Sequence, residues 1–258
     1  MRFCPLASGS SGNATYLELD GVRLLIDAGL SAKRITKLLH AIGAEPSKLD
    51  AILVTHEHVD HIRGVNTLSK RFDLPVFANA ACHEAMRFAL SGVQPGNIRV
   101  FESDAEFRFR TLRILPFSIP HDAAHPVGYV ISGRTQTVAV CTDLGRFDER
   151  ILERLRGADA VLLEANHDVD MLMAGRYPYA TKRRILSGIG HLCNEDCANA
   201  VVKLYEQGVK RIVLGHMSLE NNDPDLAMVT VRSALKLHGL DACEPILANR
   251  ESPTEVDG

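Results

Sequence analysis

The sequence predicts a layered α/β fold in which two sheets pack together and helices lie outside them. Apolar segments of strand length come first, helical segments follow, and the same order repeats in the second half of the chain. A chain of 258 residues is long enough for one domain with a sizeable core. Because no Gly-, Ser- or Pro-rich linker divides it, we expect a single domain over 1–258, with a loose polar tail at 251–258.

The strands are predicted from short runs rich in Val, Ile and Leu, bounded by turn residues. They cover 2–6, 14–19, 22–27, 49–54, 75–78, 98–101, 106–109, 112–119, 127–131, 137–141, 160–164 and 211–214. Asp20-Gly21 and Arg134-Thr135 mark hairpin turns. Apolar spacing of three and four predicts helices at 31–41, about 62–72, 80–90, 149–155, 178–186, 195–206 and 225–237. Ser31 is the expected N-cap of the first helix, and Gly43 follows its end.

Composition narrows the class of protein. The formal net charge is −3, so no global basic field draws the chain onto nucleic acid. No run of about twenty apolar residues predicts a membrane span, and the N-terminus lacks the apolar core of a signal peptide. The six cysteines are scattered without a C-x-x-C pair, which favours reduced thiols and a cytoplasmic location.

One short segment, Thr55-His56-Glu57-His58-Val59-Asp60-His61, gathers four potential metal ligands. It lies between an apolar strand and the start of a helix. Neutral imidazole nitrogens and a carboxylate suit a borderline divalent metal. The alternative is a polar surface loop with scattered histidines. Loops at strand ends commonly carry function, so we interpret the segment as a metal site.

Three further residues of ligand type, His121, Asp143 and His216, directly follow apolar strands. Each alone fits a hydrogen-bonded structural group. Together with the four ligands at 56–61 they favour one metal site formed by strand-end loops. Asp27 also ends a strand, and it is either a carboxylate that orients a metal-bound histidine or a turn former.

The 55–61 segment, with His121, Asp143 and His216, resembles the metallo-β-lactamase superfamily. Five other segments are similar to its YycJ/WalJ branch: Ser8-Gly9-Ser10-Ser11-Gly12-Asn13, Thr142-Asp143-Leu144-Gly145, Glu164-Ala165-Asn166-His167-Asp168, Gly190-His191-Leu192 and His216-Met217-Ser218-Leu219-Glu220-Asn221-Asn222. The resemblance covers essentially the whole chain. It implies an αββα sandwich of two mixed sheets, with two divalent metal ions, Zn or Mn, at one edge.

The family pattern implies how the ligands divide. His56, His58 and His121 would hold one ion, Asp60, His61 and His216 the second, and Asp143 would bridge them. Two divalent ions, two aspartates and a bridging hydroxide leave a charge of about +1, which suits an anionic phosphodiester. The hydroxide would be the nucleophile. The same charge also permits carboxylic ester or thioester substrates.

The segment 166–191 favours nucleic acid as the substrate. Tyr177, Tyr179, Lys182, Arg183 and Arg184 interleave aromatic rings with positive charge, as surfaces that track a nucleic-acid strand do. The alternative is an ordinary solvated helix face. His191 and His167 are candidate proton donors to the leaving group, beside the catalytic Asp60 and Asp143.

The predicted substrate contacts extend beyond that segment. The small residues of the loop 7–13 let the backbone approach an anion, although a plain flexible loop has the same composition. Ser218, Asn221 and Asn222 directly follow a predicted ligand. The full predicted set is Ser10, Asn13, Asn166, Tyr177, Lys182, Arg183, Ser218, Asn221 and Asn222.

The branch resemblance implies a metal-dependent DNA exonuclease that acts from the 5′ end and takes part in DNA repair. Only 72 residues separate Asp143 from His216, which leaves no room for the large inserted domain of related RNA-processing nucleases. One alternative is a small-molecule thioester or lactone hydrolase on the same scaffold. Another is a non-catalytic binding module.

Overall fold

The computed structural model describes residues 1–256, which divide into two compact units. The first unit comprises Met1–Ser118, Ala123–Gln136 and the segment from Asn249, and the second comprises Ile119–Asp122 and Thr137–Ala248. The expectation of a single domain over 1–258 stays a prediction. Among the described residues, no helix combines the length and the apolar character needed to span a membrane.

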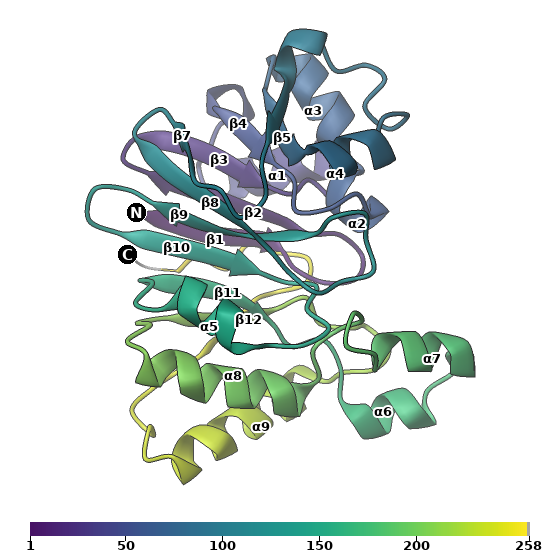
Figure 1. Ribbon diagram of the computed structural model, residues 1–258, viewed down its shortest axis with the longest axis vertical. Helices are drawn as coiled ribbons and strands as arrows, with labels where there is room; N and C mark the ends of the chain where they lie inside the picture. Colours follow the sequence, from purple (N-terminus) through teal and green to yellow (C-terminus); the bar gives the residue numbers. More distant parts are fainter. Residues whose placement is uncertain (257–258) are drawn as a thin grey trace. The chain divides into compact units, whose positions relative to one another are not determined.

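A six-stranded sheet forms the centre of the first unit, and its strands follow one another in chain order (Figure 1). β1 (Arg2–Ala7), β2 (Ala14–Leu19) and β3 (Val22–Ile26) are antiparallel. Asp20 and Gly21 form the predicted hairpin turn with φ of 49° and 78°. β4 (Ala51–Leu53), β5 (Val76–Asn79) and β6 (Ile98–Phe101) continue the sheet in parallel with β3, so it is mixed.

Three helices supply the apolar core on this sheet: α1 (Ala32–Ala41), α3 (Val65–Phe72) and α4 (Ala80–Ala85). The Ser31 hydroxyl caps α1 by accepting the N–H of Arg34, as predicted. Leu39 of α1 and Leu68 of α3 are completely buried with Ile52 of β4, and each such side chain contributes about 2 kcal/mol. This packing positions the carboxyl end of β4, after which the segment with the predicted metal ligands, 55–61, begins.

The predicted helix at 80–90 is shorter in the structure, because α4 ends at Ala85. After it, the N–H groups of Arg87 and Ser91 bond carbonyls three residues back, which replaces the helical pattern with successive turns. Leu90 and Val93 are still buried, so the apolar spacing reflects core packing rather than a continued helix.

Three antiparallel strands form a second layer within the first unit: β7 (Phe107–Phe109), β8 (Leu112–Ser118) and β9 (Val127–Ser132). The Tyr129 hydroxyl on β9 donates to the Val54 carbonyl at 2.6 Å. The rings of Phe107 and Phe77 stack with centroids 5.5 Å apart. Strands of two sheets therefore pack face to face, as the sequence predicts.

The tail that the sequence predicts to be loose, 251–258, makes hydrogen bonds with β1 in its described part. The N–H groups of Thr254 and Val256 donate to the carbonyls of Pro5 and Phe3 on β1, both at 2.9 Å. Glu255 also pairs with Arg2 at 3.1 Å. These bonds are made mainly by the backbone, which polar composition does not reveal, and the looseness of the tail stays a prediction. Residues 257–258 lie outside the described residues.

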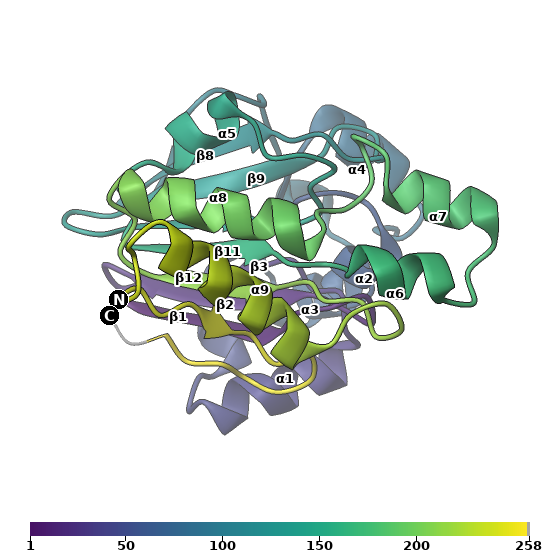
Figure 2. The ribbon, with the colours of Figure 1, turned by 90° about the horizontal axis from the view of Figure 1, so that it is seen from below.

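Four parallel strands form the centre of the second unit: β10 (Thr137–Cys141), β11 (Ala160–Glu164), β12 (Ile212–Gly215) and β13 (Ile246–Leu247). α5 (Glu149–Leu155), α8 (Asn194–Glu206) and α9 (Pro224–Leu237) accompany them, and α8 lies beside α9 (Figure 2). Two shorter helices, α6 (Val169–Ala174) and α7 (Tyr179–Ile185), form a hairpin between β11 and α8. α6 and β13 were not predicted.

The strands make two mixed sheets, of six and seven strands, and helices accompany both. The predicted α/β class of two mixed sheets with outer helices is therefore confirmed. Parallel strands share one direction, so their carboxyl ends gather at one edge of each sheet. His56 and His58 follow the carboxyl end of β4, Asp143 that of β10 and His216 that of β12.

Asp159, before β11, gives a stability prediction. Its carboxylate accepts the Thr137 N–H at 2.7 Å and the Lys210 ammonium at 2.6 Å. Burial alone would raise the pKa of Asp159, but these bonds outweigh burial and lower it. We expect Asp159→Asn to reduce the free energy of unfolding by about 1 kcal/mol at pH 7. Because the folded-state pKa is the lower one, this difference is present above about pH 4 and disappears as the pH falls through the folded pKa.

Urea unfolding of the unmodified protein and of Asp159→Asn, each at pH 7 and at pH 3, measures this difference in the free energy of unfolding. The matched control is Glu149→Gln, since Glu149 pairs with Lys203 at 2.8 Å on the exposed surface and should contribute little. Equal losses in the two variants would contradict the expectation.

Candidate metal centre

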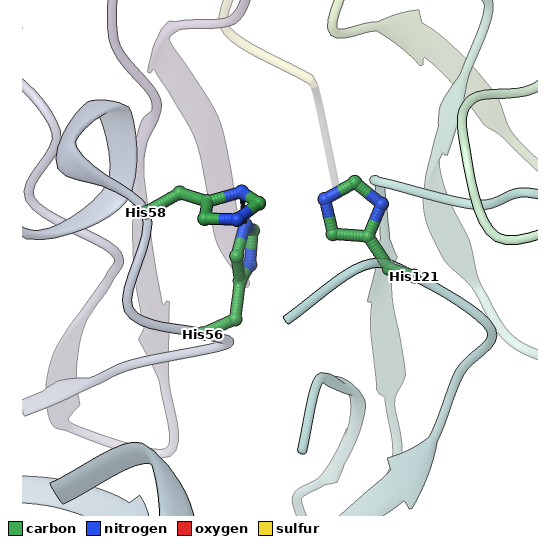
Figure 3. Close-up of side chains that lie close together, drawn as sticks. All are labelled: His56, His58 and His121. Carbon is green, nitrogen blue, oxygen red and sulfur yellow. Dashed lines mark hydrogen bonds between the residues drawn. The ribbon is translucent and has the colours of Figure 1, made fainter. Parts of the chain in front are cut away.

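In the first unit, the predicted ligands occupy the loop after β4 and the single-turn helix α2 (Val59–Ile62). His56 and His58 come from the loop, and both side chains project from it (Figure 3). Nε2 of His56 lies 3.0 Å from Nδ1 of His58, and the His61 ring centroid is 4.1 Å from that of His56. Several imidazole nitrogens thus converge within a few ångströms.

Asp27 orients two of these histidines, which supports the first of its two sequence interpretations. Its carboxylate accepts the N–H and the hydroxyl of Thr55, both at 2.8 Å, and its Oδ2 lies 2.8 Å from Nδ1 of His61. The Thr55 oxygen is in turn 3.0 Å from Nδ1 of His56. When Nδ1 carries the proton in both rings, Nε2 is left with the lone pair that a metal needs.

Asn13 is buried against the same loop, whereas its neighbour Ser10 is exposed. The Asn13 amide nitrogen lies 3.0 Å from Nε2 of His61 and 3.5 Å from Oδ2 of Asp60. The structure therefore gives Asn13 a supporting contact with predicted ligands, because its side chain faces inward. The substrate contact predicted for Ser10 stays a prediction.

In the second unit, Asp143 follows β10, Glu164 ends β11, and His216 follows β12. The ligand atoms of these three residues and of His191 all lie within 4.8 Å of one another. Asp143 and His216 have φ of 61° and 54°, the left-handed region that non-glycine residues adopt uncommonly, although Asp and His do so more often than most. Residues in this region cluster where a fold positions functional side chains.

The histidines of this unit repeat the arrangement found around Asp27. Nδ1 of His121 lies 3.0 Å from the Gly190 carbonyl, and Nδ1 of His216 lies 2.7 Å from Oε1 of Glu164. The opposite nitrogens, Nε2 of both rings, lie 3.6 and 3.5 Å from Oδ1 of Asp143. These separations exceed a hydrogen bond and leave the lone pairs directed at a carboxylate. Neutral imidazoles around a carboxylate form the donor set of a divalent metal, so these residues fit one.

Glu164 is a candidate site residue that the sequence interpretation missed. It is completely buried, and its carboxylate contacts Nδ1 of His191 at 2.9 Å as well as His216. Its Oε2 accepts the N–H groups of Leu144 at 2.6 Å and Leu192 at 3.1 Å. Burial alone would raise its pKa, but the charges and hydrogen bonds of the two histidines outweigh burial and hold the pKa well below its usual range. The sequence did contain a signal for this role, because Glu164 is a carboxylate at the end of an apolar strand, as Asp27 is.

The two candidate proton donors differ in their surroundings. Burial lowers the pKa of His191, but the adjacent Glu164 carboxylate outweighs burial and raises it. Burial lowers the pKa of His167 to about 4, so this ring is neutral at pH 7. His167 is 1% exposed, and within residues 1–256 neither of its ring nitrogens has a hydrogen-bond partner. The His191 side chain is 16% exposed and can be reached from solvent.

The four polar residues after β11 and β12 that are predicted to contact substrate, Asn166, Ser218, Asn221 and Asn222, form hydrogen bonds within the protein. The Asn166 amide donates to the His216 carbonyl at 2.9 Å, and the Asn222 amide donates to the Ala165 carbonyl at 3.0 Å. The Ser218 hydroxyl accepts the N–H of Asn221 at 3.1 Å. All four side chains are buried, and the prediction that they contact substrate stays a prediction.

The basic residues of α7 and the nearby Tyr177 differ in how far their side chains are used in contacts within the fold. Lys182 donates to the carbonyls of Met173 and Gly175 at 2.6 and 2.7 Å and so caps the end of α6. Arg184 pairs with Asp122 at 3.0 Å. Arg183 is exposed, and Tyr177 is half-buried. The ammonium group of Lys182 is thus used inside the fold, and the predicted substrate contacts of Tyr177, Lys182 and Arg183 stay predictions.

Comparison with known proteins identifies the relatives of this arrangement. A family model described as a beta-lactamase superfamily domain matches residues 22–217. The exodeoxyribonuclease YycJ of Bacillus anthracis is 39% identical over 244 residues, which are 95% of this chain and 92% of that protein. The exodeoxyribonuclease WalJ of Streptococcus pneumoniae is 42% identical over 236 residues, covering 91% and 88%.

Solved structures share the fold at lower identity. The metallo-beta-lactamase fold protein YhfI from Bacillus subtilis superimposes with a TM-score of 0.74 and 17% identity, covering 99% of this chain and 100% of that one. Zn(2+)-bound PqqB from Methylobacterium extorquens superimposes with a TM-score of 0.72 and is 18% identical, again covering 99% of this chain and 100% of that one. At such identities the likeness concerns the fold alone.

Proposed function

The chain belongs to the beta-lactamase superfamily, and from that premise we propose that it is a metal-dependent hydrolase that degrades DNA as an exonuclease. The two exodeoxyribonuclease relatives match nearly the whole chain at about 40% identity. A hydrolase of small thioesters or lactones, or a non-catalytic module, is less consistent with these relatives.

The observation that carries the proposal is the repeated orientation of the histidines. In each unit one nitrogen of a ring is tied to an acceptor, and the other is directed towards a carboxylate or another histidine. We adopt the family assignment for two ions, Zn or Mn. By that assignment His56, His58 and His121 would hold one ion, Asp60, His61 and His216 would hold the second, and Asp143 would be a further ligand.

When bound, two divalent ions would neutralise phosphodiester charge and lower the pKa of the attacking water. The residues of the chain supply orientation and a proton. Asp27 and Glu164 fix the rings of His61 and His216, each through its Nδ1. We assign His191 as the proton donor to the leaving oxygen, because Glu164 holds its Nδ1 and its side chain is accessible. His167 is enclosed and less suited to that role.

The substrate assignment rests on the relatives and on surface chemistry. Tyr177 and the exposed Arg183 suit a base and a phosphate of a DNA strand. We propose cleavage from the 5′ end and a role in DNA repair. All six cysteines are free, which agrees with a reducing compartment, so we propose a cytoplasmic location.

Incubation of the purified protein with end-labelled DNA tests this function. We expect mononucleotide release with Mn²⁺ or Zn²⁺, starting at the 5′ end, and a loss of more than about a hundredfold after chelation, since the ions supply the nucleophile. Parallel assays on RNA and on thioester and lactone substrates compare the alternatives. Turnover of a thioester without DNA cleavage would contradict the proposal, as would a metal content far below two ions per chain.

A further inference from the structure

Asn13 uses every hydrogen-bonding group that it has. Its N–H donates to the Asp60 carbonyl at 2.8 Å, and its carbonyl accepts the Gly29 N–H at 2.7 Å. Its Oδ1 accepts the Gly9 N–H at 2.9 Å. The side-chain amide then faces His61 and Asp60. One residue thus joins three loops: 8–13, the segment after β3, and the predicted ligand loop.

Close packing holds these loops in place independently of the Asn13 side chain. A Cβ atom at Gly29 would lie only 1.5 Å from the Asp60 carbonyl oxygen, so this approach requires glycine. The two backbone hydrogen bonds of Asn13 span the same contact. Removal of the Asn13 side chain should therefore leave the backbone of the site in place.

The Asn13 amide contacts the nitrogen of His61 that a metal would use. Nδ1 of His61 faces Asp27 at 2.8 Å, so the lone pair lies on Nε2, 3.0 Å from the Asn13 amide nitrogen. One lone pair accepts one partner at a time, either this N–H or a cation. Oδ2 of Asp60 lies 3.5 Å from the same amide nitrogen, slightly beyond a good hydrogen bond. The amide carries two N–H groups, so it can donate to either acceptor while Oδ1 keeps the Gly9 N–H.

We propose that Asn13 is a positioning residue for the Asp60–His61 half of the metal site. Without metal its amide donates to Nε2 of His61 and keeps the ring aligned. When an ion takes that nitrogen, the amide donates to the Asp60 carboxylate and fixes the second ligand. This inference rests on the proposed metal-dependent function, but it concerns the binding of the ion rather than the substrate.

The chemistry requires an amide at position 13. The side chain must accept from the Gly9 N–H and donate to Asp60 or His61, and a carboxylate cannot do both when ionised. Aspartate would also place a second negative charge beside Asp60, with no proton to donate. Asn13→Ala removes the donor, and Asn13→Asp removes it while retaining the shape.

Metal binding, measured by calorimetry with Zn²⁺ and Mn²⁺ alone, tests the proposal. We expect Asn13→Ala to weaken one of two binding events by tenfold or more and to leave the other unchanged, as is usual when a group that supports a ligand is lost. Asn199→Ala, which removes an exposed asparagine amide on α8, is the matched control and should bind both ions as the unmodified protein does.

A second measurement detects the contact without metal or activity. In ¹⁵N spectra of the metal-free protein, Asn13→Ala should shift the Nε2 resonance of His61, whereas Asn199→Ala should not. Two ions bound by Asn13→Ala with unchanged affinity would overturn this inference alone. Failure of the unmodified protein to bind any ion would overturn the proposed function with it. DNA cleavage does not enter either readout, so the two failures are distinguishable.

Discussion

Asp143→Asn is expected to reduce DNA cleavage by about a thousandfold, which corresponds to about 4 kcal/mol in the activation barrier. The Asp143 carboxylate is 1% exposed, with Nε2 of His121 and of His216 at 3.6 and 3.5 Å. Asparagine has the same shape but no charge, so it cannot balance a divalent ion between these rings. It also tolerates the φ of 61° at this position, so the fold should persist. Steady-state cleavage of end-labelled DNA gives the rate, and thermal unfolding checks the fold.

Asp170→Asn is the control for this variant, because Asp170 is an exposed carboxylate on α6 in the same unit. It should cleave DNA at the unmodified rate. Retention of more than a tenth of the activity by Asp143→Asn, with metal content unchanged, would remove Asp143 from the proposed mechanism.

Glu164→Gln is expected to affect both stability and catalysis. The carboxylate accepts four hydrogen bonds, two from His191 and His216 and two from the backbone of Leu144 and Leu192. A glutamine amide has one oxygen, so its NH₂ group must face two of these donors. We expect a loss of about 2–4 kcal/mol in the free energy of unfolding, since buried groups are left unpaired. We also expect a fall in DNA cleavage of about a hundredfold or more, because both rings lose their orientation.

Chemical denaturation and cleavage assays on the same preparation separate these two effects. Glu195→Gln is the matched control, since Glu195 is an exposed glutamate in the first turn of α8. It should change neither quantity appreciably. A Glu164→Gln variant with unchanged stability would show that the four hydrogen bonds are not simultaneously present.

The ligand types were predictable because their positions obey a local rule. His56, Asp143 and His216 each follow an apolar strand, and parallel strands bring such positions to one sheet edge. The boundaries of β10 and β11 follow from their Val and Leu content and agree with the prediction. Local sequence therefore carries much of the fold and the identity of the candidate ligands.

The roles that depend on distant partners were not predictable in this way. In the sequence Glu164 is only the last residue of an apolar strand. Its role follows from its contacts with Leu144, His191 and His216, which are distant in the sequence. Lys182 reads as a phosphate contact, but its ammonium group reaches back to the carbonyls that end α6. The sequence places Asn13 in a loop of small residues, whereas in the structure its N–H donates to the Asp60 carbonyl. In each case hydrogen bonds between separate segments decide the role, and spacing along the chain does not encode them.

The left-handed backbone at Asp27, Asp143 and His216 has a consequence for engineering and evolution. At each of these positions a glycine would relax the backbone by about 1 kcal/mol, but it would delete a predicted ligand or, at Asp27, the carboxylate that orients His61. At Asp27 and His216 it would also leave buried hydrogen-bonding groups without their partner, which costs at least as much as the relaxation gains. Selection for heat resistance therefore does not act against these two side chains, and glycine there should lower turnover without raising the melting temperature.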